Sequence, residues 1–219
     1  MKISLLGGTG DIAEGLVLRW TKAGHRIVIG SRSDEKAKGI ARDYNQRLSE
    51  LGIEASIEGL PNAEAAADSE VVVISLPYEY TVGTLNQIRD SFTNQIVISP
   101  VVPMKREGKV FTYAAPQRGS AALEIKEALP EGVRLVSAYH NLPAAELKKI
   151  DRELNYDVVL CGDDDESKQV VMKLTEDMPK LRPLDAGSLE ASMMIEAMTP
   201  LIVNLNIRYK PQHFSVKFV

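Results

Sequence analysis

The sequence is poor in cysteine and in aromatic residues, and it contains no long apolar run. Cys161 is the only cysteine among 219 residues, so no intramolecular disulfide can form, and a reducing cytoplasm is the expected compartment. No stretch reaches the roughly 18 to 20 apolar residues that span a bilayer. The first residues hold few apolar side chains, Ile3, Leu5 and Leu6, and give way to glycine too soon for the core of a signal peptide.

A strong charge of either sign is also missing. The chain has 26 Lys and Arg against 30 Asp and Glu, a net charge of −4. Nucleic acids and anionic membranes usually require a clustered basic surface, so neither is expected as a partner. Four successive acids occupy residues 163–166. No His, Cys or distant acid completes a ligand spacing with them, so we expect a helix N-terminus there and no metal.

What the sequence does contain is an alternation of short apolar runs with longer, helix-periodic stretches. Strands are predicted at residues 2–6, 26–29, 54–57, 71–76, 95–99 and 134–138, and helices at 11–23, 34–51, 78–89 and 120–129. Residues 100–119, rich in proline, glycine and basic side chains, are predicted to form a functional loop. This alternation predicts an α/β fold built on a doubly wound parallel sheet.

The texture changes after about residue 139. A strand at 157–161, a helix at 165–177, a strand at 181–184 and a long helix at 188–208 are predicted from there on. We expect a smaller C-terminal α/β domain, which divides the chain into residues 1–139 and 140–219.

A glycine-rich turn follows the first predicted strand and opens the first predicted helix. Gly8, Thr9, Gly10, Asp11, Ile12 and Ala13 form the pattern G-x-G-x-x-A. The first glycine permits a tight turn, the second lets backbone N–H groups approach a pyrophosphate, and the small alanine permits close packing of helix on strand. The pattern predicts a dinucleotide-binding domain of the Rossmann type, with a plain glycine turn as the alternative. Any contact of Asp11 with phosphate would be made by its backbone N–H.

The end of the second predicted strand indicates which dinucleotide binds. NAD sites normally carry an acid there, which accepts hydrogen bonds from the adenosine ribose. This chain instead has Ser31 and Arg32, followed by Lys36 in the next helical turn. A guanidinium, an ammonium and a hydroxyl suit a 2′-phosphate, so the residues favour NADP over NAD. Solvated surface charges are the alternative.

Several segments, taken in order, resemble the archaeal F420-dependent NADP reductases. They are LLGGTGD at 5–11, IGSRS at 29–33 with Lys36, SPVVP at 99–103, CGDDDESK at 161–168, RPLDAG at 182–187 and TPLIVNLNI at 199–207. The resemblance covers essentially the whole chain. It implies an enzyme that moves a hydride between NADP(H) and coenzyme F420, an 8-hydroxy-5-deazaflavin, in a cleft between a Rossmann domain and a smaller domain. Such a protein mainly stacks two rings and excludes water.

The same resemblance points to individual residues. It implies that Leu76, Tyr80, Val102 and Ala144 border NADP and that Thr199, Pro200 and Phe214 border F420. His140 is implied to contact the deazaflavin and to polarise it, with a hydrogen-bonded hinge histidine as the alternative. The chain departs from the family at Met193 and Ala197, where some members carry an arginine and a serine.

Two other functions stay open at this point. One is an NADP-dependent reductase of a small imine or carbonyl substrate, and the other is a non-catalytic NADP-sensing module. A reductase of that kind generally supplies a general acid, and no Lys, Tyr or Asp occupies an evident acid position, which favours transfer between two organic cofactors. The apolar final helix predicts a homodimer or a higher homo-oligomer.

Overall fold

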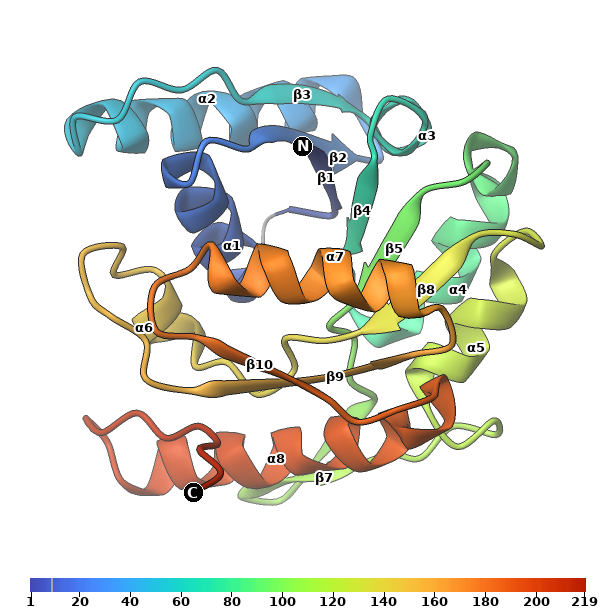
Figure 1. Cartoon of the computed structure of the whole chain (residues 1–219), viewed down its shortest axis with the longest axis vertical. Coiled ribbons are helices and arrows are strands. Elements are labelled where there is room, and N and C mark those ends of the chain that lie inside the picture. Colours follow the sequence, from blue (N-terminus) through green and yellow to red (C-terminus); the bar gives the residue numbers. More distant parts are fainter. Residues whose placement is uncertain (9) are drawn as a thin grey trace.

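The computed structural model describes residues 1–8 and 10–219. An eight-stranded sheet runs through it in the order β10-β9-β8-β5-β4-β1-β2-β3 (Figure 1). The strands are β1 (Lys2–Leu6), β2 (Arg26–Ser31), β3 (Glu58–Pro61), β4 (Val71–Ile74), β5 (Ile96–Ser99), β8 (Arg134–Ser137), β9 (Asp157–Gly162) and β10 (Arg182–Asp185). Neighbours are parallel except for the antiparallel pair β8 and β9. The predicted α/β fold with a mostly parallel sheet is confirmed.

Helices cover both faces of this sheet. The helices α1 (Asp11–Lys22), α2 (Asp34–Glu50) and α7 (Asp165–Glu176) share one apolar cluster, and α3 (Asn62–Ala67), α4 (Tyr78–Gln87) and α5 (Ala121–Ala128) share a second cluster on the other face. The short α6 (Ala144–Leu147) packs on α1, and the long α8 (Ser192–Arg208) lies over β9. Within the described residues, no helix is long and apolar enough to cross a bilayer.

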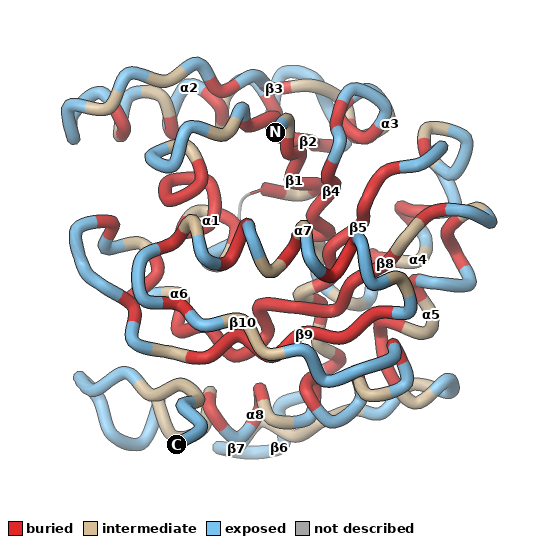
Figure 2. The backbone as a smooth tube through the Cα atoms, viewed as in Figure 1, coloured by how far each residue is buried: buried red, intermediate tan, exposed pale blue. Residues whose placement is uncertain are grey.

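The central strands are buried because their apolar residues run without interruption. In β4, Val71 and Val73 belong to one cluster, and Val72 and Ile74 belong to the other. A strand with both faces covered is typical of a parallel sheet between two helical layers. Figure 2 shows the buried backbone concentrated in these strands, with the exposed backbone on the outer helices and loops.

The C-terminal residues extend the same sheet. Val136 and Ser137 of β8 pair with Gly162 and Cys161 of β9, and β10 then adds to β9 in parallel. The predicted division lies between residues 139 and 140, yet β8 before it and β9 after it belong to one sheet. The division into domains 1–139 and 140–219 therefore stays a prediction.

The third strand is the clearest correction to the predicted elements. It lies at Glu58–Pro61 rather than at residues 54–57. The side chain of Asn45 in α2 donates to the carbonyl of Ile57 and accepts from its N–H, at 2.9 and 2.8 Å. Residue 57 is therefore fastened to α2 by the hydrogen bonds that a strand would give to its neighbour, and pairing with β2 begins one residue later.

The predicted loop at 100–119 is also wrong in part. It contains an antiparallel hairpin of β6 (Met104–Glu107) and β7 (Val110–Tyr113), which turns at Gly108 with a φ of 61°. Asn204 of α8 holds this hairpin, since its side chain accepts from the N–H of Phe111 and donates to its carbonyl, both at 2.8 Å. The final helix also begins later than predicted, after a 3₁₀ turn at Leu189–Ala191.

Candidate nucleotide-binding site

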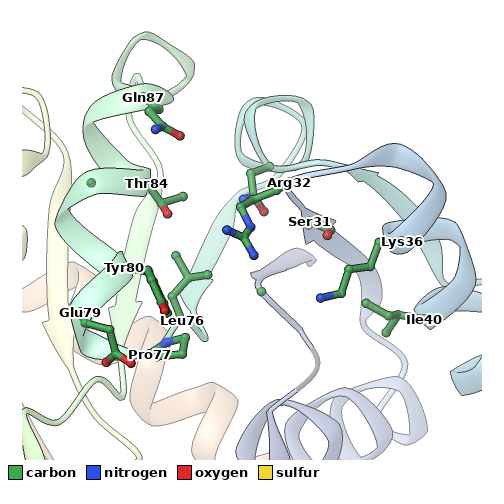
Figure 3. A pocket seen from close by; sticks show the side chains of 14 residues that line it. Ser31, Arg32, Lys36, Ile40, Leu76, Pro77, Glu79, Tyr80, Thr84 and Gln87 are labelled. Carbon is green, nitrogen blue, oxygen red and sulfur yellow. The ribbon is translucent and has the colours of Figure 1, made fainter.

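A cavity of about 370 Å³ opens where β1, β2 and β4 end, with α4 as its far wall (Figure 3). The predicted residues Ser31, Arg32, Lys36, Leu76 and Tyr80 all line it. Ligands of such sheets bind outside the carboxyl ends of the strands, and β1 and β4 are the neighbours whose connections leave on opposite faces. The cavity therefore lies where an open α/β sheet normally holds a nucleotide.

Two cations enter this cavity without an acidic partner. Figure 3 shows Arg32 and Lys36 extending into the same space, while Glu79 lies at the other end of the cavity, next to Pro77. Across the described part of the chain, neither cationic side chain forms an ion pair or a hydrogen bond. Two cations beside the hydroxyl of Ser31, unpaired among the described residues, could together hold a multiply charged anion.

In the glycine-rich turn, the residue whose backbone conformation requires glycine is Gly7 rather than Gly8. Gly7 has a φ of +78°, and a Cβ there would lie 2.5 Å from Cδ2 of Leu76. Gly10 is the N-cap of α1 with an extended backbone, and a Cβ there would make only an ordinary contact with Ser75. The sequence reading missed Gly7, although the doubled glycine was a signal. Thr9 lies outside the described residues.

The turn is held from behind by α2. The hydroxyl of Tyr44 donates to the carbonyl of Gly8 at 2.7 Å, and burial raises the pKa of this phenol to about 12. The phenol therefore stays a hydrogen-bond donor throughout the neutral range. Tyr44 fixes the carbonyl of Gly8 to the adjacent helix, a role that no pattern in the sequence indicates.

The first turn of α1 is joined to α6. Lys148 forms ion pairs with Asp11 and, at 2.7 Å, with Glu14. The carboxylate of Asp11 therefore faces a lysine, and Ile12 is half-buried against the core. These contacts place the segment after β8 beside the helix that begins at the glycine-rich turn.

A second cavity, of about 430 Å³, holds Ala144 and lies apart from the one that holds Arg32. It is lined by Pro143, Ala144, Ala145, Val203, Asn206, Ile207, Lys210, Pro211 and His213. Asn206 orders the tail here, because its side chain accepts from the N–H of Phe214 and donates to its carbonyl. The Phe214 ring packs edge-on against Tyr209 with a 5.7 Å separation of centroids. Val102 is half-buried after β5 and lines neither cavity.

His140 is buried, with 5% of its surface exposed. Its Nε2 lies 3.3 Å from the hydroxyl of Ser137, and in the described chain its Nδ1 has no hydrogen-bond partner. Desolvation lowers the pKa of His140 to about 3, so the ring is neutral near pH 7. Thr199, next to Pro200 inside α8, donates to the backbone carbonyl of His140 at 3.2 Å. This contact ties the segment after β8 to the middle of α8.

Glu196 was not singled out by the sequence, yet it is the one acid of α8 and is fully buried. Its carboxylate accepts from the N–H groups of Ala121 and Ala122 and from the hydroxyl of Tyr113. Burial raises the pKa of Glu196 to about 7. The residue joins α8 both to the N-terminus of α5 and to the hairpin.

The acids at residues 163–166 serve the start of α7, as predicted. Asp164 is the N-cap and accepts from the N–H of Ser167 at 2.8 Å. Asp163 accepts from the N–H of Leu189 at 2.9 Å, and Asp165 pairs with Lys168.

Comparison with known proteins identifies the family of this chain. Residues 2–103 match the family described as NADP oxidoreductase coenzyme F420-dependent. A curated F420-dependent NADP reductase of Methanocaldococcus jannaschii is 41% identical, covering 99% of this chain and 97% of the relative. The enzyme of that name from Methanothermobacter thermautotrophicus is 34% identical, covering 99% and 94%.

The fold recurs in a crystal structure from Arthrobacter sp. FB24. It superimposes with a TM-score of 0.84 over 100% of this chain and 99% of that one, at 21% identity. The resemblance inferred from the sequence is thus confirmed along the whole chain. Given this match of sequence and fold, the chain belongs to the family of F420-dependent NADP reductases.

Proposed function

We propose that this protein transfers a hydride between NADP(H) and coenzyme F420. The observation that carries the proposal is the match, over 99% of the chain, to curated enzymes named F420-dependent NADP reductase. The cavity beside β2 supports it independently, because its charged residues are those that a phosphorylated dinucleotide requires.

The 2′-phosphate of NADP fits the end of β2. Among the described residues Arg32 and Lys36 form no ion pair with an acid, and Ser31 supplies a hydroxyl at the same place. An acid that would accept hydrogen bonds from a free ribose is missing from this strand end. These three residues would therefore hold the phosphate and select NADP over NAD.

The pyrophosphate fits the turn between β1 and α1. Gly8, Thr9, Gly10, Asp11 and Ile12 would present backbone N–H groups to it. A helix N-terminus favours an anion because its first N–H groups lack intrahelical partners. Leu76 and Tyr80 line the cavity across from the cations and would border the nucleotide. We assign Val102, which follows β5, to the nicotinamide end.

The deazaflavin would occupy the second cavity. Its walls come from Pro143 and Ala144 after β8 and from Val203 and Ile207 of α8, so they are mostly apolar. Thr199, Pro200 and Phe214 would border the ring system, since they belong to α8 or to the tail that Asn206 orders. Ala144 would then lie between the two cofactors.

Bound NADPH supplies the hydride from C4 of its nicotinamide, and C5 of the deazaflavin receives it. The protein's task is to orient the two rings and to exclude water. His140 would take part as a neutral ring, because burial keeps its pKa near 3. It would act through a hydrogen bond rather than as a cation or a proton donor.

We also propose that the protein works in a reducing cytoplasm as a homodimer or a higher homo-oligomer. Cys161 is buried and free. Met194 and Leu201 of α8 expose 63% and 61% of their surface, and covering such residues on a long helix favours association. Light scattering on the purified protein tests the assembly, and a monomer at all concentrations would reject it.

The assay for the proposed function follows deazaflavin absorbance while the purified protein is mixed with NADPH and oxidised F420. We expect the absorbance to fall, and to return when NADP⁺ is added to reduced F420. Parallel assays with cyclic imines and small carbonyl compounds should show no NADPH oxidation. Binding of NADPH without transfer to any acceptor would support the sensing module instead.

A further inference from the structure

One buried polar group on the wall of the nucleotide cavity has no hydrogen-bond partner. Asn62 is 5% exposed, lines the cavity beside β2, and leaves its Oδ1 unsatisfied within the described chain. Among the described residues, five other buried polar atoms share this condition, and none of their residues lines this cavity. A buried carbonyl without a donor is destabilising, so a ligand that supplies the donor would recover that cost.

The position of Asn62 follows from strand pairing. Gly30 and Ser31 of β2 pair with Leu60 and Pro61 of β3, so the next residues on the two strands, Arg32 and Asn62, leave the sheet side by side. Asn62 is the first residue of α3 and follows a proline that fixes the local backbone. The amide therefore lies on a rigid element next to the predicted phosphate site.

Gly30 leaves the room for this amide. A Cβ on Gly30 would lie 2.8 Å from Oδ1 of Asn62 and 2.8 Å from Cδ2 of Leu6. Any larger residue at position 30 would push the carboxamide from its place. The absence of a side chain at Gly30 thus allows the Asn62 amide to pack against the backbone of β2.

The adenine base is the part of NADP that must reach this place. Adenine is attached to the ribose carbon next to the one that carries the 2′-phosphate, so a phosphate at Arg32 and Lys36 keeps the base within one sugar of Asn62. The far wall is formed by Thr84 and Gln87 of α4, across from β2 (Figure 3). Adenine offers an exocyclic amino group as a donor, and a carboxamide is the side chain that pairs with adenine edges.

We propose that Asn62 recognises the adenine base of NADP(H): its carboxamide, whose Oδ1 is enclosed in the free protein, rotates toward the cavity so that Oδ1 accepts a hydrogen bond from the exocyclic amino group. This inference rests on the proposed binding of NADP(H) in the same cavity. It makes Asn62 a specificity residue for the base, separate from Arg32 and Lys36, which select the phosphate.

The test measures binding rather than turnover. The dissociation constants of NADPH and of its hypoxanthine analogue, deamino-NADPH, are compared by nucleotide fluorescence. The analogue replaces the amino donor with a carbonyl. Wild-type protein should bind NADPH roughly tenfold more tightly than the analogue, since a buried acceptor would otherwise face another acceptor. A wild-type ratio near one would overturn the proposal.

Two variants assign the effect to this side chain. In Asn62→Ala the ratio should fall to about one, mainly because NADPH binds less tightly. In Asn62→Asp the acceptor is kept, so the ratio should stay high even if the added charge weakens both nucleotides. A ratio that is unchanged in Asn62→Ala would contradict the assignment. A variant that alters the preference for NADPH over NADH instead would place Asn62 at the phosphate and also overturn it.

Folding and the proposed function are checked separately. Because Oδ1 has no partner in the protein alone, Asn62→Ala should keep the melting temperature of the free protein within a few degrees of wild type. Arg32→Ala is the matched control, since it should lower the NADPH preference over NADH while the ratio of NADPH to deamino-NADPH stays high. Failure of wild-type protein to bind NADPH at all would reject the proposed function. Binding of NADPH and deamino-NADPH with equal affinity would reject the role of Asn62 alone.

Discussion

The cations at the two ends of the sheet are treated differently. Near β2, Arg32 and Lys36 extend into a cavity with no acid beside them. Near β9 and β10, Arg182 holds the buried Asp157 through two hydrogen bonds of 2.8 and 2.6 Å, and Lys168 contacts Asp185 at 2.8 Å. Of these four described cations, Arg182 and Lys168 are neutralised by acids, whereas Arg32 and Lys36 are not.

This difference separates charge used for folding from charge kept for a ligand. A buried acid must be paired, because an isolated buried charge is strongly destabilising. A cation at a cavity wall can stay hydrated until an anion arrives. A small net charge of −4 is therefore compatible with a local positive site, and the two kinds of cation should respond differently to substitution.

The largest effect is expected at the paired end. Asp157→Asn should lower the free energy of unfolding by about 3 kcal/mol, because the buried carboxylate gives up its charge-assisted hydrogen bonds from Arg182 and Lys217. Urea denaturation measures the loss. Asp151→Asn, which removes an 83% exposed partner of Lys22, is the control and should change stability by less than about 1 kcal/mol. Equal losses in the two variants would remove the distinction between buried and exposed pairs.

The same carboxylate gives an acid limit to stability. Hydrogen bonding from Arg182 lowers the pKa of Asp157 to about 2, below the ordinary value of 3.8. The stabilisation is complete above pH 4 to 5 and is lost as the pH falls toward 2. Asp157→Asn should therefore show a flatter stability profile than wild type in that window.

The next effect tests the unpaired end. Arg32→Ala should weaken NADPH binding by roughly 30- to 100-fold, an amount typical of a charge-assisted contact with phosphate, and should change NADH binding little. Stability should hardly change, since Arg32 pairs with no acid in the described protein.

Lys36 offers a matched comparison on one helix. Lys36→Ala should also weaken the binding of NADPH more than that of NADH. Lys38 lies outside the cavity and pairs with Asp34 at 2.6 Å, so Lys38→Ala should leave the binding of both NADPH and NADH unchanged. If Lys38→Ala weakened NADPH as much as Lys36→Ala, the general field of the protein rather than a local site would attract the phosphate.

A smaller effect concerns His140, which lies between the two ends. Its pKa in the folded protein, about 3, is below the ordinary value of 6.5. The unfolded chain therefore binds the extra proton first, and stability falls as the pH drops below about 6.5. The difference between wild type and His140→Gln should change by about 2 kcal/mol between pH 7 and pH 4.5. Contributions of other groups, including Glu196, cancel in this difference. Parallel profiles of stability against pH in wild type and His140→Gln would mean that the ring is hydrated and that burial does not lower its pKa.

The smallest effect tests the support behind the turn. Tyr44→Phe removes a 2.7 Å hydrogen bond to the carbonyl of Gly8 and should cost about 1 kcal/mol in stability, with a few-fold loss of NADPH affinity. Tyr139→Phe removes a buried bond to Thr175 on α7. It should lower stability similarly without changing NADPH affinity. Equal losses of NADPH affinity in the two variants would mean that Tyr44 has no specific role in supporting the nucleotide site.

The sequence indicated the cationic site because its chemistry is local. Strand, glycine turn and helix follow one another within a few residues, and Arg32 and Lys36 occur at the strand end where the fold puts a phosphate. The structure places Ser31, Arg32, Lys36, Leu76 and Tyr80 on one cavity as expected. The order of these residues along the chain was sufficient to predict that they line one cavity.

The parts that were missed depend on contacts between distant residues. The strand predicted at 54–57 has the right composition, but the side chain of Asn45 binds its last residue and delays pairing. The hairpin at β6 and β7 exposes its polar strand and is held by Asn204, more than 90 residues away. Asn62 became notable only because strand pairing and Gly30 bring its amide to the cavity. No periodicity in the sequence records such relations.

The most direct measurement follows the hydride itself. NADPH carrying deuterium at C4 of the nicotinamide, in the transferable position, is mixed with oxidised F420 and the protein in ordinary water, and the reduced deazaflavin is analysed by NMR. We expect one deuterium at C5, because transfer between rings that the protein holds together in a site closed to water leaves the label unexchanged. Reduced F420 without deuterium, or no reduction despite NADPH binding, would contradict direct hydride transfer.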